Sequence, residues 1–197
     1  MPKRTFDFIK YKKAIDFSFN FYGSKLRKGI KYPYFSYLSS VSNMIIENNG
    51  STEEAIAGLF HDILEEKDGP KKSNTIKLKF GVKVFNIVKQ CSNQHQYGQN
   101  ESSWREKKKQ FIDNMGKKSQ SSLLVSICDK IHSLNCIIND HNKIGKKLWH
   151  NNPLEPQDYY WYYRSLCTNF KKFLKNHKSL KDKLQRNVNE LGHLLKS

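Results

Sequence analysis

Hydrophobic residues recur along this chain at the three- and four-residue spacing that places them on one side of an α-helix. Ile127, Ile131, Leu134 and Ile138 show this spacing most clearly. The pattern predicts helices over residues 4–23, 36–48, 75–80, the first half of 82–91, 103–115, 119–140, 157–176 and 179–195. No stretch shows the period-two alternation of a half-buried strand, and no internal repeat or Gly-Ser linker divides the chain. The sequence therefore predicts an all-α fold in a single domain over residues 1–197.

A further helix is predicted from a capping signal. Ser51-Thr52-Glu53-Glu54 matches a capping box, in which a Ser and a Glu three residues later satisfy each other's backbone donors. Asp68-Gly69-Pro70 closes this helix. It carries His61 and Asp62, and Glu65 follows them by four and three residues. In a continuous helix Glu65 would therefore lie on the same face as both.

His61 and Asp62 stand in a strongly apolar run, which predicts that both are largely buried. A buried imidazole or carboxylate needs a partner or a cation, because an isolated buried charge is costly. Asp129, in another predicted helix, would join them if the two helices pack together. One imidazole and two carboxylates suit Mn²⁺, Fe²⁺ or Mg²⁺ in an open octahedral site. A hydrogen-bonded His-Asp core pair, with Asp129 facing solvent, is the alternative that the spacing leaves open.

The net charge of the chain indicates which classes of ligand it could bind. The chain has 35 Lys and Arg against 18 Asp and Glu, a formal net charge of +17. This balance favours a polyanion: nucleic acid, an anionic membrane surface or a small phosphorylated substrate. The charges are spread along the chain, as is typical of solvated helix faces.

The cysteines, the apolar runs and the N-terminal residues indicate where in the cell the protein acts. The four cysteines form no C-x-x-C pair and suit reduced thiols better than zinc ligands or disulfides. No apolar run approaches the ~20 residues of a membrane span. The N-terminal residues lack the apolar stretch of a signal peptide. We therefore expect a cytoplasmic protein without a membrane partner.

Six segments occur in the order that one enzyme family has them. They are Arg27-Lys28-Gly29 with 32–38, Glu54 to Asp62, Phe80-Gly81-Val82 with 83–92, Trp104-Arg105-Glu106 with Lys108, Ser126 to His132, and Trp161-Tyr162-Tyr163-Arg164. The chain resembles the HD-domain phosphohydrolases, in the branch related to alarmone (ppGpp) 3′-pyrophosphohydrolases. The resemblance covers a core of about residues 10–175, with the C-terminal helices continuing to 197. It implies an all-helical HD bundle.

The resemblance also implies a metal site. The family holds its metal with a His, a His-Asp pair and a distant Asp, and His61, Asp62 and Asp129 match three of these ligands. The first His of the family falls where this chain has Tyr37. A neutral phenol is a poor replacement for imidazole. Mn²⁺, or another divalent metal, is therefore expected to bind weakly or not at all.

Further site residues are implied in the same way. Glu65 and Glu66 stand where the family has an acidic pair, and they would serve as catalytic acid or base. His132 follows Asp129 by three residues, so it could orient Asp129 or make a simple core hydrogen bond. Basic residues in the matching segments would bind the phosphates of a substrate: Arg27, Lys28, Arg105, Lys108 and Lys130.

Three functions remain open at this stage. The first is hydrolysis of a phosphorylated nucleotide such as guanosine 3′,5′-bis(diphosphate). The second is a pseudoenzyme that binds a nucleotide without cleaving it, because the Asn and Arg that follow the family's Asp-x-x-His are replaced by Ser133 and Asn135. The third is a basic module that binds nucleic acid through surface lysines. The aromatic block 159–163 suits helix packing, although its tyrosine hydroxyls and Arg164 could also reach the pocket.

Overall fold

The computed structural model describes residues 5–27, 31–92, 103–150 and 154–196. Within these ranges the regular structure is helical, apart from one isolated bridge between Leu26 and Pro33. The α-helices are α1 (Phe8–Tyr22), α2 (Tyr34–Glu47), α3 (Thr52–Phe60), α4 (Ser73–Phe80), α5 (Val82–Cys91), α6 (Trp104–Asp113), α7 (Gln120–Ile144), α8 (Lys147–His150), α9 (Pro156–Phe173) and α10 (Lys178–Leu194). Short 3₁₀ turns span Ile63–Glu65, Pro70–Lys72 and Met115–Lys117. The predicted all-α fold is confirmed.

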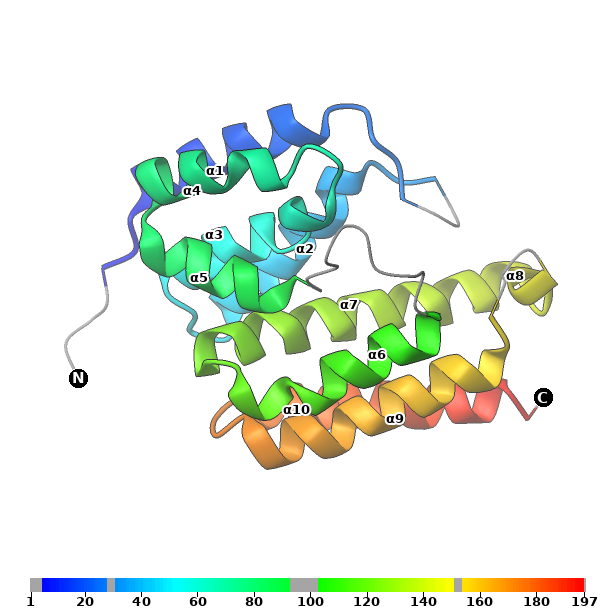
Figure 1. Cartoon of the computed structure of the whole chain (residues 1–197). Helices are drawn as coiled ribbons and strands as arrows, with labels where there is room; N and C mark the ends of the chain where they lie inside the picture. Colours follow the sequence, from blue (N-terminus) through cyan, green and yellow to red (C-terminus); the bar gives the residue numbers. More distant parts are fainter. Residues whose placement is uncertain (1–4, 28–30, 93–102, 151–153, 197) are drawn as a thin grey trace.

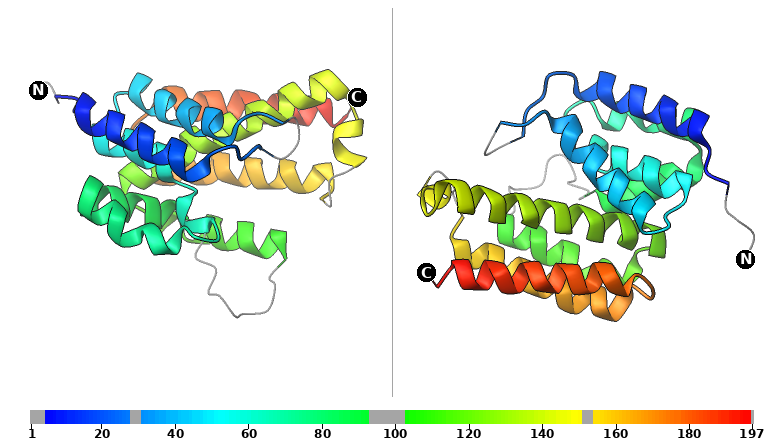
Figure 2. Two further views of the ribbon diagram at one scale, coloured as in Figure 1. Left: turned by 90° about the horizontal axis from the view of Figure 1, so that it is seen from above. Right: turned by 180° about the vertical axis from the view of Figure 1, so that it is seen from behind.

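The long helix α7 runs through the middle of the bundle (Figure 1). Helices α2, α3 and α5 pack on one side of it, and α9 and α10 pack on the other. Seen from behind in Figure 2, α10 runs alongside α7. Helices α1 and α4 lie outside α3 and α5. This arrangement brings α2, the end of α3 and the middle of α7 together at the centre of the molecule.

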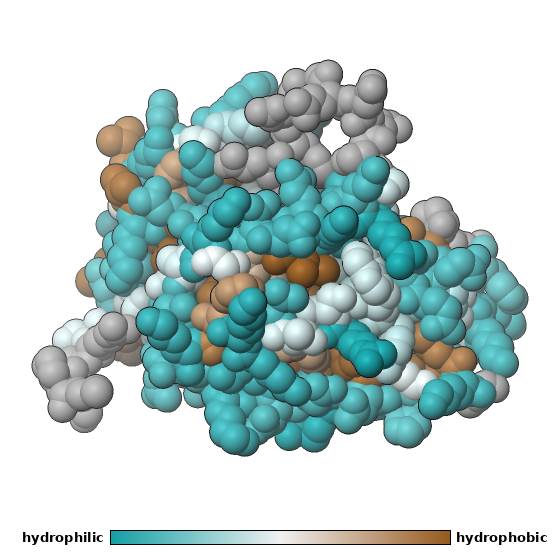
Figure 3. All heavy atoms as spheres, turned by 60° about the horizontal axis from the view of Figure 1, so that its bottom comes forward, coloured by the Kyte–Doolittle hydropathy of each residue, from teal (hydrophilic) through white to brown (hydrophobic). Residues whose placement is uncertain are grey.

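The first half of α7 is buried on all sides. Every residue from Ser122 to Asp129 is buried, because neighbouring helices cover both faces of this stretch. A helix that is buried all round loses the polar stripe of a surface helix. Asp129 therefore lies in the core, with 5% of its surface exposed. The outer surface is different: on the face shown in Figure 3, hydrophilic residues surround a smaller apolar area.

Helix α3 begins at the predicted capping box. The Ser51 hydroxyl accepts from the Glu54 backbone at 3.3 Å, and the Glu54 carboxylate accepts from the Ser51 backbone at 2.7 Å. Gly58 lies where α3 crosses α2. A Cβ there would lie 2.7 Å from Ile45 Cδ1 and 3.1 Å from Ser42 Cα. The missing side chain lets the two helices approach closely, which brings the residues at their ends within contact.

The end of α3 corrects one expectation. The helix predicted to run on to Asp68-Gly69-Pro70 ends at Phe60, with His61 as its C-cap, and Glu65 lies in the following 3₁₀ turn. The expectation that Glu65 shares a helical face with His61 is wrong. The chain folds back here: a Cβ on Gly69 would lie 1.6 Å from the Ile63 carbonyl oxygen. Gly69 thus lies against the backbone of the 3₁₀ turn that follows α3.

Candidate functional site

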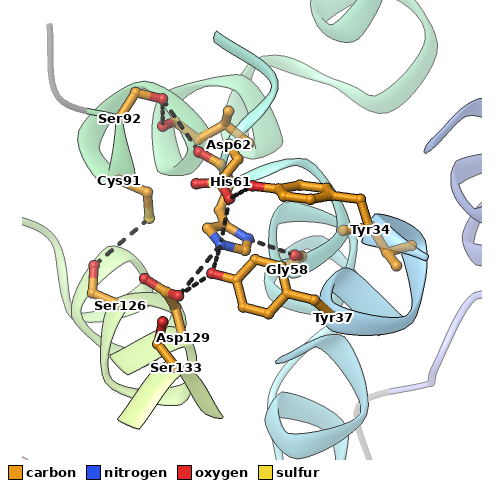
Figure 4. Close-up of polar contacts among 12 residues, drawn as sticks. Tyr34, Tyr37, Gly58, His61, Asp62, Cys91, Ser92, Ser126, Asp129 and Ser133 are labelled. Carbon is orange, nitrogen blue, oxygen red and sulfur yellow. Dashed lines mark hydrogen bonds and ion pairs between the residues drawn. The ribbon is translucent and has the colours of Figure 1, made fainter. Parts of the chain in front are cut away.

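Four side chains from two helices and the turn after a third meet inside the bundle (Figure 4). Tyr37 comes from α2, His61 and Asp62 from the turn that directly follows α3, and Asp129 from α7. His61 Nε2 lies 3.5 Å from Asp62 Oδ2 and 3.7 Å from Asp129 Oδ1. The same nitrogen lies 2.9 Å from Tyr37 Oη. The structure therefore brings the three candidate ligands together, with a phenol among them.

The hydrogen positions in this cluster follow from donor counting. His61 Nδ1 donates to the Gly58 carbonyl at 2.8 Å, and Tyr37 donates its single hydroxyl hydrogen to Asp129. The contact of Tyr37 with Nε2 then needs a proton on that nitrogen. Burial lowers the pKa of His61, but Asp62 and Asp129 outweigh it and raise this pKa to about 9. Burial and the nearby Asp129 raise the pKa of Tyr37 well above its usual value. The cluster at neutral pH thus holds an imidazolium and a neutral phenol.

The carboxylates have partners as well. Lys130 Nζ lies 2.5 Å from Asp129 Oδ2, and Tyr34 Oη donates to Asp62 Oδ2 at 2.6 Å. Burial raises the pKa of Asp129, but Lys130 and His61 outweigh it and hold this pKa well below its usual range. Lys130 and the imidazolium of His61 thus balance the two negative charges.

The donor set suits a divalent cation in the type of its atoms, and two of its distances are of the size that a shared ion requires. Two ligands bound to one ion at about 2.1 Å lie roughly 3–4 Å apart, which matches the distances from His61 to Asp62 and Asp129. As the side chains stand, however, the described residues contain no group of three His, Cys, Asp or Glu arranged as a metal site. Metal binding would require Nε2 of His61 to lose its proton and Asp129 to share its contacts with Tyr37 and Lys130. The ligand roles of these residues stay a prediction.

A cavity of about 150 Å³ adjoins the cluster. Its walls include His61, Asp62 and Asp129, with Glu65 beside them. Glu66 is not among the lining residues. It forms an ion pair with Lys25. Of the two glutamates that the sequence suggests as catalytic, Glu65 is therefore the one that faces the candidate site.

A second cavity, of about 290 Å³, adjoins the first and has aromatic walls. Lys108, Lys130 and Ser133 line both cavities. The aromatic walls come from three helices and include Trp104, Trp149, Tyr159, Tyr162 and Tyr163. Three tyrosines of the block 159–163 thus reach the pocket, whereas the exposed Arg164 does not line it. The buried hydroxyl of Tyr162 has no hydrogen-bond partner within the described part of the chain.

Arg27 reaches the larger cavity through three contacts. Its guanidinium stacks 4.2 Å from the centre of the Tyr37 ring. It donates to Cys136 Sγ at 3.1 Å and to Ser133 Oγ at 3.4 Å. These contacts hold a positive charge between the aromatic cavity and the His61 cluster.

Another predicted phosphate-binding residue, Arg105, does not reach the site in this way. Arg105 pairs with Asp158 at 3.1 Å and stacks over Trp161, and its side chain is 62% exposed. It lines neither cavity, because it projects from the outer side of α6 toward α9. Lys28 lies outside the described residues.

Of the two roles that the sequence leaves open for His132, orienting Asp129 or making a hydrogen bond elsewhere, its contacts match the second. Its ring packs against Tyr37, with ring centres 5.4 Å apart, and its Nε2 lies 3.6 Å from Cys136 Sγ. Among the described residues it makes no hydrogen bond to Asp129. Sequence reasoning missed Tyr34, the donor to Asp62, although Tyr34 precedes Tyr37 by three residues and so shares its helical face.

The HD-domain family model matches residues 14–149, more than half of the chain. This chain belongs to the HD-domain family. The matched range runs from α1 to α8 and includes Tyr37 and the candidate ligands His61, Asp62 and Asp129. Membership confirms the resemblance drawn from the sequence and assigns a phosphohydrolase-like function to the HD bundle.

Several solved structures share this fold, among them two whose likeness to this chain spans most of its length. One is described as a metazoan ortholog of SpoT that hydrolyzes ppGpp and plays a role in starvation responses. It has 18% identity and a TM-score of 0.75, over 95% of this chain and 98% of that chain. The other, lmo0812 from Listeria monocytogenes, has 20% identity and a TM-score of 0.65, over 78% of this chain and 96% of that chain.

No curated protein matches the HD-domain chain. Among its described helices, none has the length and apolar character needed to cross a membrane.

Proposed function

We propose that this HD-domain chain is a metal-assisted phosphohydrolase of a phosphorylated nucleotide. The observation that carries the proposal is the pair of adjoining cavities. The smaller ends at His61 and two carboxylates, and the larger has aromatic walls. Lys108 and Lys130 line both. A nucleotide suits this pair, with a phosphate group toward His61 and its base against the aromatic rings.

The basic residues would hold the phosphates. Arg27 lines the larger cavity, and Lys108 and Lys130 line the boundary between the two. Burial and the nearby Lys130 lower the pKa of Lys108 to about 8. A bound phosphate would favour the charged form of Lys108, because an opposite charge stabilises an ammonium. Charge-assisted hydrogen bonds to phosphate are among the strong ones.

His61, Asp62 and Asp129 would hold a divalent cation, and Mn²⁺ is our candidate. Such a cation, when bound, lowers the pKa of water and polarises a phosphoryl oxygen. Glu65, on the wall of the smaller cavity, would accept a proton from the attacking water or give one to the leaving oxygen. The described ppGpp hydrolysis of the metazoan structure makes guanosine 3′,5′-bis(diphosphate) the first substrate to test.

A second candidate function is nucleotide binding without cleavage. The observation that favours it is the set of hydrogen bonds that Tyr34, Tyr37 and Lys130 make to the two carboxylates. These contacts compete with a metal for the same oxygen atoms. In such a pseudoenzyme the phosphate-binding lysines would matter and the candidate ligands would not.

One assay separates the two candidates. The purified protein is incubated with guanosine 3′,5′-bis(diphosphate), in Mn²⁺ and in EDTA, and pyrophosphate release and nucleotide binding are both measured. Release that needs Mn²⁺ and is lost in His61→Gln supports the hydrolase. Binding without release supports the pseudoenzyme. Absence of both would contradict both candidates for this nucleotide.

A further inference from the structure

One face of helix α7 lines the larger cavity along its length. Ser133, Ile137 and Asp140 lie three or four residues apart on this face. Ser133 also lines the smaller cavity, whereas Asp140 does not. With a rise of about 1.5 Å per residue, Asp140 lies about 10 Å further along the helix axis than Ser133. Asp140 therefore lies at the end of the larger cavity that is remote from His61.

The charges on the walls of this cavity differ between its two ends. Asp140 is the one acidic side chain among the described residues that line it. Of the basic side chains, Lys108 and Lys130 lie at the boundary with the smaller cavity. A phosphate is attracted by the lysines and repelled by the carboxylate. A nucleotide would thus lie with its phosphates toward that boundary and its base toward Asp140.

Aromatic rings lie beside Asp140 at this end. The ring centre of Trp149 lies 5.6 Å from that of Tyr159 and 6.1 Å from that of His141, the residue after Asp140. A base that stacks on Trp149 or Tyr159 turns its flat face to the rings and its hydrogen-bonding edge away from them. Asp140, half-buried on the cavity wall, supplies an acceptor for that edge.

The bases differ in the donors that this edge offers. A carboxylate accepts two parallel N–H groups well, as it does from the fork of an arginine. Guanine offers two adjacent N–H groups, at N1 and at its 2-amino group. Hypoxanthine keeps only the first, and adenine offers its amino group beside an acceptor nitrogen. Asp140 also has contacts within the chain, and the roughly four lone-pair sites of a carboxylate leave room for both.

We propose that Asp140 determines which base the larger cavity accepts, because its carboxylate accepts hydrogen bonds from the two adjacent N–H groups of guanine. This inference deepens the proposed nucleotide function and rests on its assignment of the larger cavity to the base. The candidate metal ligands and the lysines at the boundary take no part in this selection.

Calorimetric titration with nucleoside diphosphates tests the inference. The diphosphates of guanosine, inosine and adenosine (GDP, IDP and ADP) differ in the base alone, and each is titrated in EDTA and in Mn²⁺. GDP should bind about 10- to 150-fold more tightly than IDP, because the missing amino group removes one hydrogen bond to a charged acceptor. ADP should also bind more weakly than GDP.

Asp140→Asn should reverse the selection. The amide keeps one acceptor oxygen and replaces the other with an NH₂ donor, which meets the 2-amino group of guanine donor to donor. Xanthosine diphosphate has a carbonyl oxygen in place of that amino group, so the variant should bind it about 10-fold more tightly than GDP. Asp113→Asn is the matched control, because it makes the same exchange at an exposed position of α6 that lines neither cavity. It should keep the preference for GDP.

The outcomes separate this inference from the proposed function. Equal affinities of the unchanged protein for GDP, IDP and ADP would overturn the inference and leave the nucleotide function standing. A preference for GDP that survives in Asp140→Asn would overturn it too, because another group would then read the base. Binding of none of the nucleotides would contradict the nucleotide function itself, and this inference with it. If Asp140→Asn fails to fold by circular dichroism, Asp140→Ala is the second variant, and it should bind GDP and IDP with equal affinity.

Discussion

The hydroxyl oxygen of Tyr37 lies 2.9 Å from Nε2 of His61, the nitrogen that would face a metal. Tyr37 gives its hydrogen to Asp129, so it links two candidate ligands from different helices. A neutral phenol at this point satisfies both groups and adds no charge. The cluster is therefore complete as a hydrogen-bonded core network, and a metal has to compete with that network.

Replacing Tyr37 with His should raise the affinity for Mn²⁺. The substitution removes the phenol contact to Asp129 and supplies an imidazole nitrogen on the same face of α2. Loss of one supporting contact around a metal commonly costs about 10–100-fold in affinity, so a restored direct ligand should gain at least about that much. Calorimetric titration with Mn²⁺ measures the change.

Tyr37→Phe is the matched control for this gain. It removes the same hydroxyl and offers no nitrogen, so an increase seen in Tyr37→His and absent from Tyr37→Phe identifies the imidazole as a ligand. Equal affinities for the His variant and the unchanged protein would mean that position 37 is not the missing ligand position. Equal gains in both variants would assign the effect to the freed oxygen of Asp129.

Replacing Glu65 with Gln should cut pyrophosphate release by about 10²- to 10⁴-fold, the usual contribution of a general acid-base group. Glu65 lines the cavity beside the candidate ligands, whereas its neighbour Glu66 pairs with Lys25. Glu66→Gln is therefore the matched control and should lose much less activity. Steady-state rates in Mn²⁺ compare the variants. Equal rates for Glu65→Gln and the unchanged protein would remove Glu65 from the proton-transfer role.

Stability should depend on pH through His61. Its pKa in the folded protein is about 9, above the usual value of 6.5. The stability that this raised pKa contributes is fully present below about pH 6.5 and is lost as the pH rises through about 9, by at most about 3 kcal/mol. Urea unfolding at several pH values measures the free energy of unfolding.

Comparison with His61→Gln isolates this contribution, because other groups act in the opposite direction. Burial lowers the pKa values of Lys108 and Lys118 to about 8, so their effect favours the folded state as the pH rises. The difference in stability between the unchanged protein and His61→Gln should shrink between about pH 6.5 and 9. A difference that stays constant across this range would show that His61 is not charged in the folded protein.

The aromatic cavity should contribute to nucleotide binding and not to pyrophosphate binding. Trp149 forms part of its wall, with its ring 5.6 Å from that of Tyr159. Trp149→Ala should weaken binding of guanosine 3′,5′-bis(diphosphate) by about 5- to 150-fold, because stacking a base on an aromatic ring contributes about 1–3 kcal/mol. Pyrophosphate affinity serves as the internal control. Equal losses for both probes would mean that Trp149 supports the phosphate site rather than a base.

Local patterns in the sequence predict much of this site. The helical spacing around Ile127 and Ile131 predicts α7, but it leaves open whether Asp129 is buried or faces solvent, and the packing of other helices on α7 buries it. The capping box at Ser51 predicts where α3 begins. The sequence does not predict where α3 ends. Gly69 lies against Ile63 just after that end, and such a contact between segments leaves no periodic pattern in the sequence.

The features of the site that the sequence does not predict depend on contacts between helices that are far apart in the chain. Arg105 and Lys108 lie on one helix, yet Arg105 turns to Asp158 and Lys108 turns into both cavities. Which of them faces the site depends on how α6 is rotated against α9. The aromatic lining has the same origin, since Trp104 and Trp149 come from separate helices and meet through Tyr159.

The crossing of α2 and α3 should tolerate no added methyl group at Gly58. Gly58→Ala would place a Cβ 2.7 Å from Ile45 Cδ1 and 3.1 Å from Ser42 Cα, so α2 has to shift. We expect a loss of about 1–3 kcal/mol in the free energy of unfolding, the usual cost of overpacking, against a gain of about 1 kcal/mol from the helix preference of Ala. Ile45→Val removes the closest atom and alone should cost about 0.5–1.5 kcal/mol. The double variant should therefore lose less stability than the sum of the losses measured in the two single variants. Urea unfolding of the four proteins completes the cycle, and strict additivity would show that the Ile45 contact does not limit this crossing.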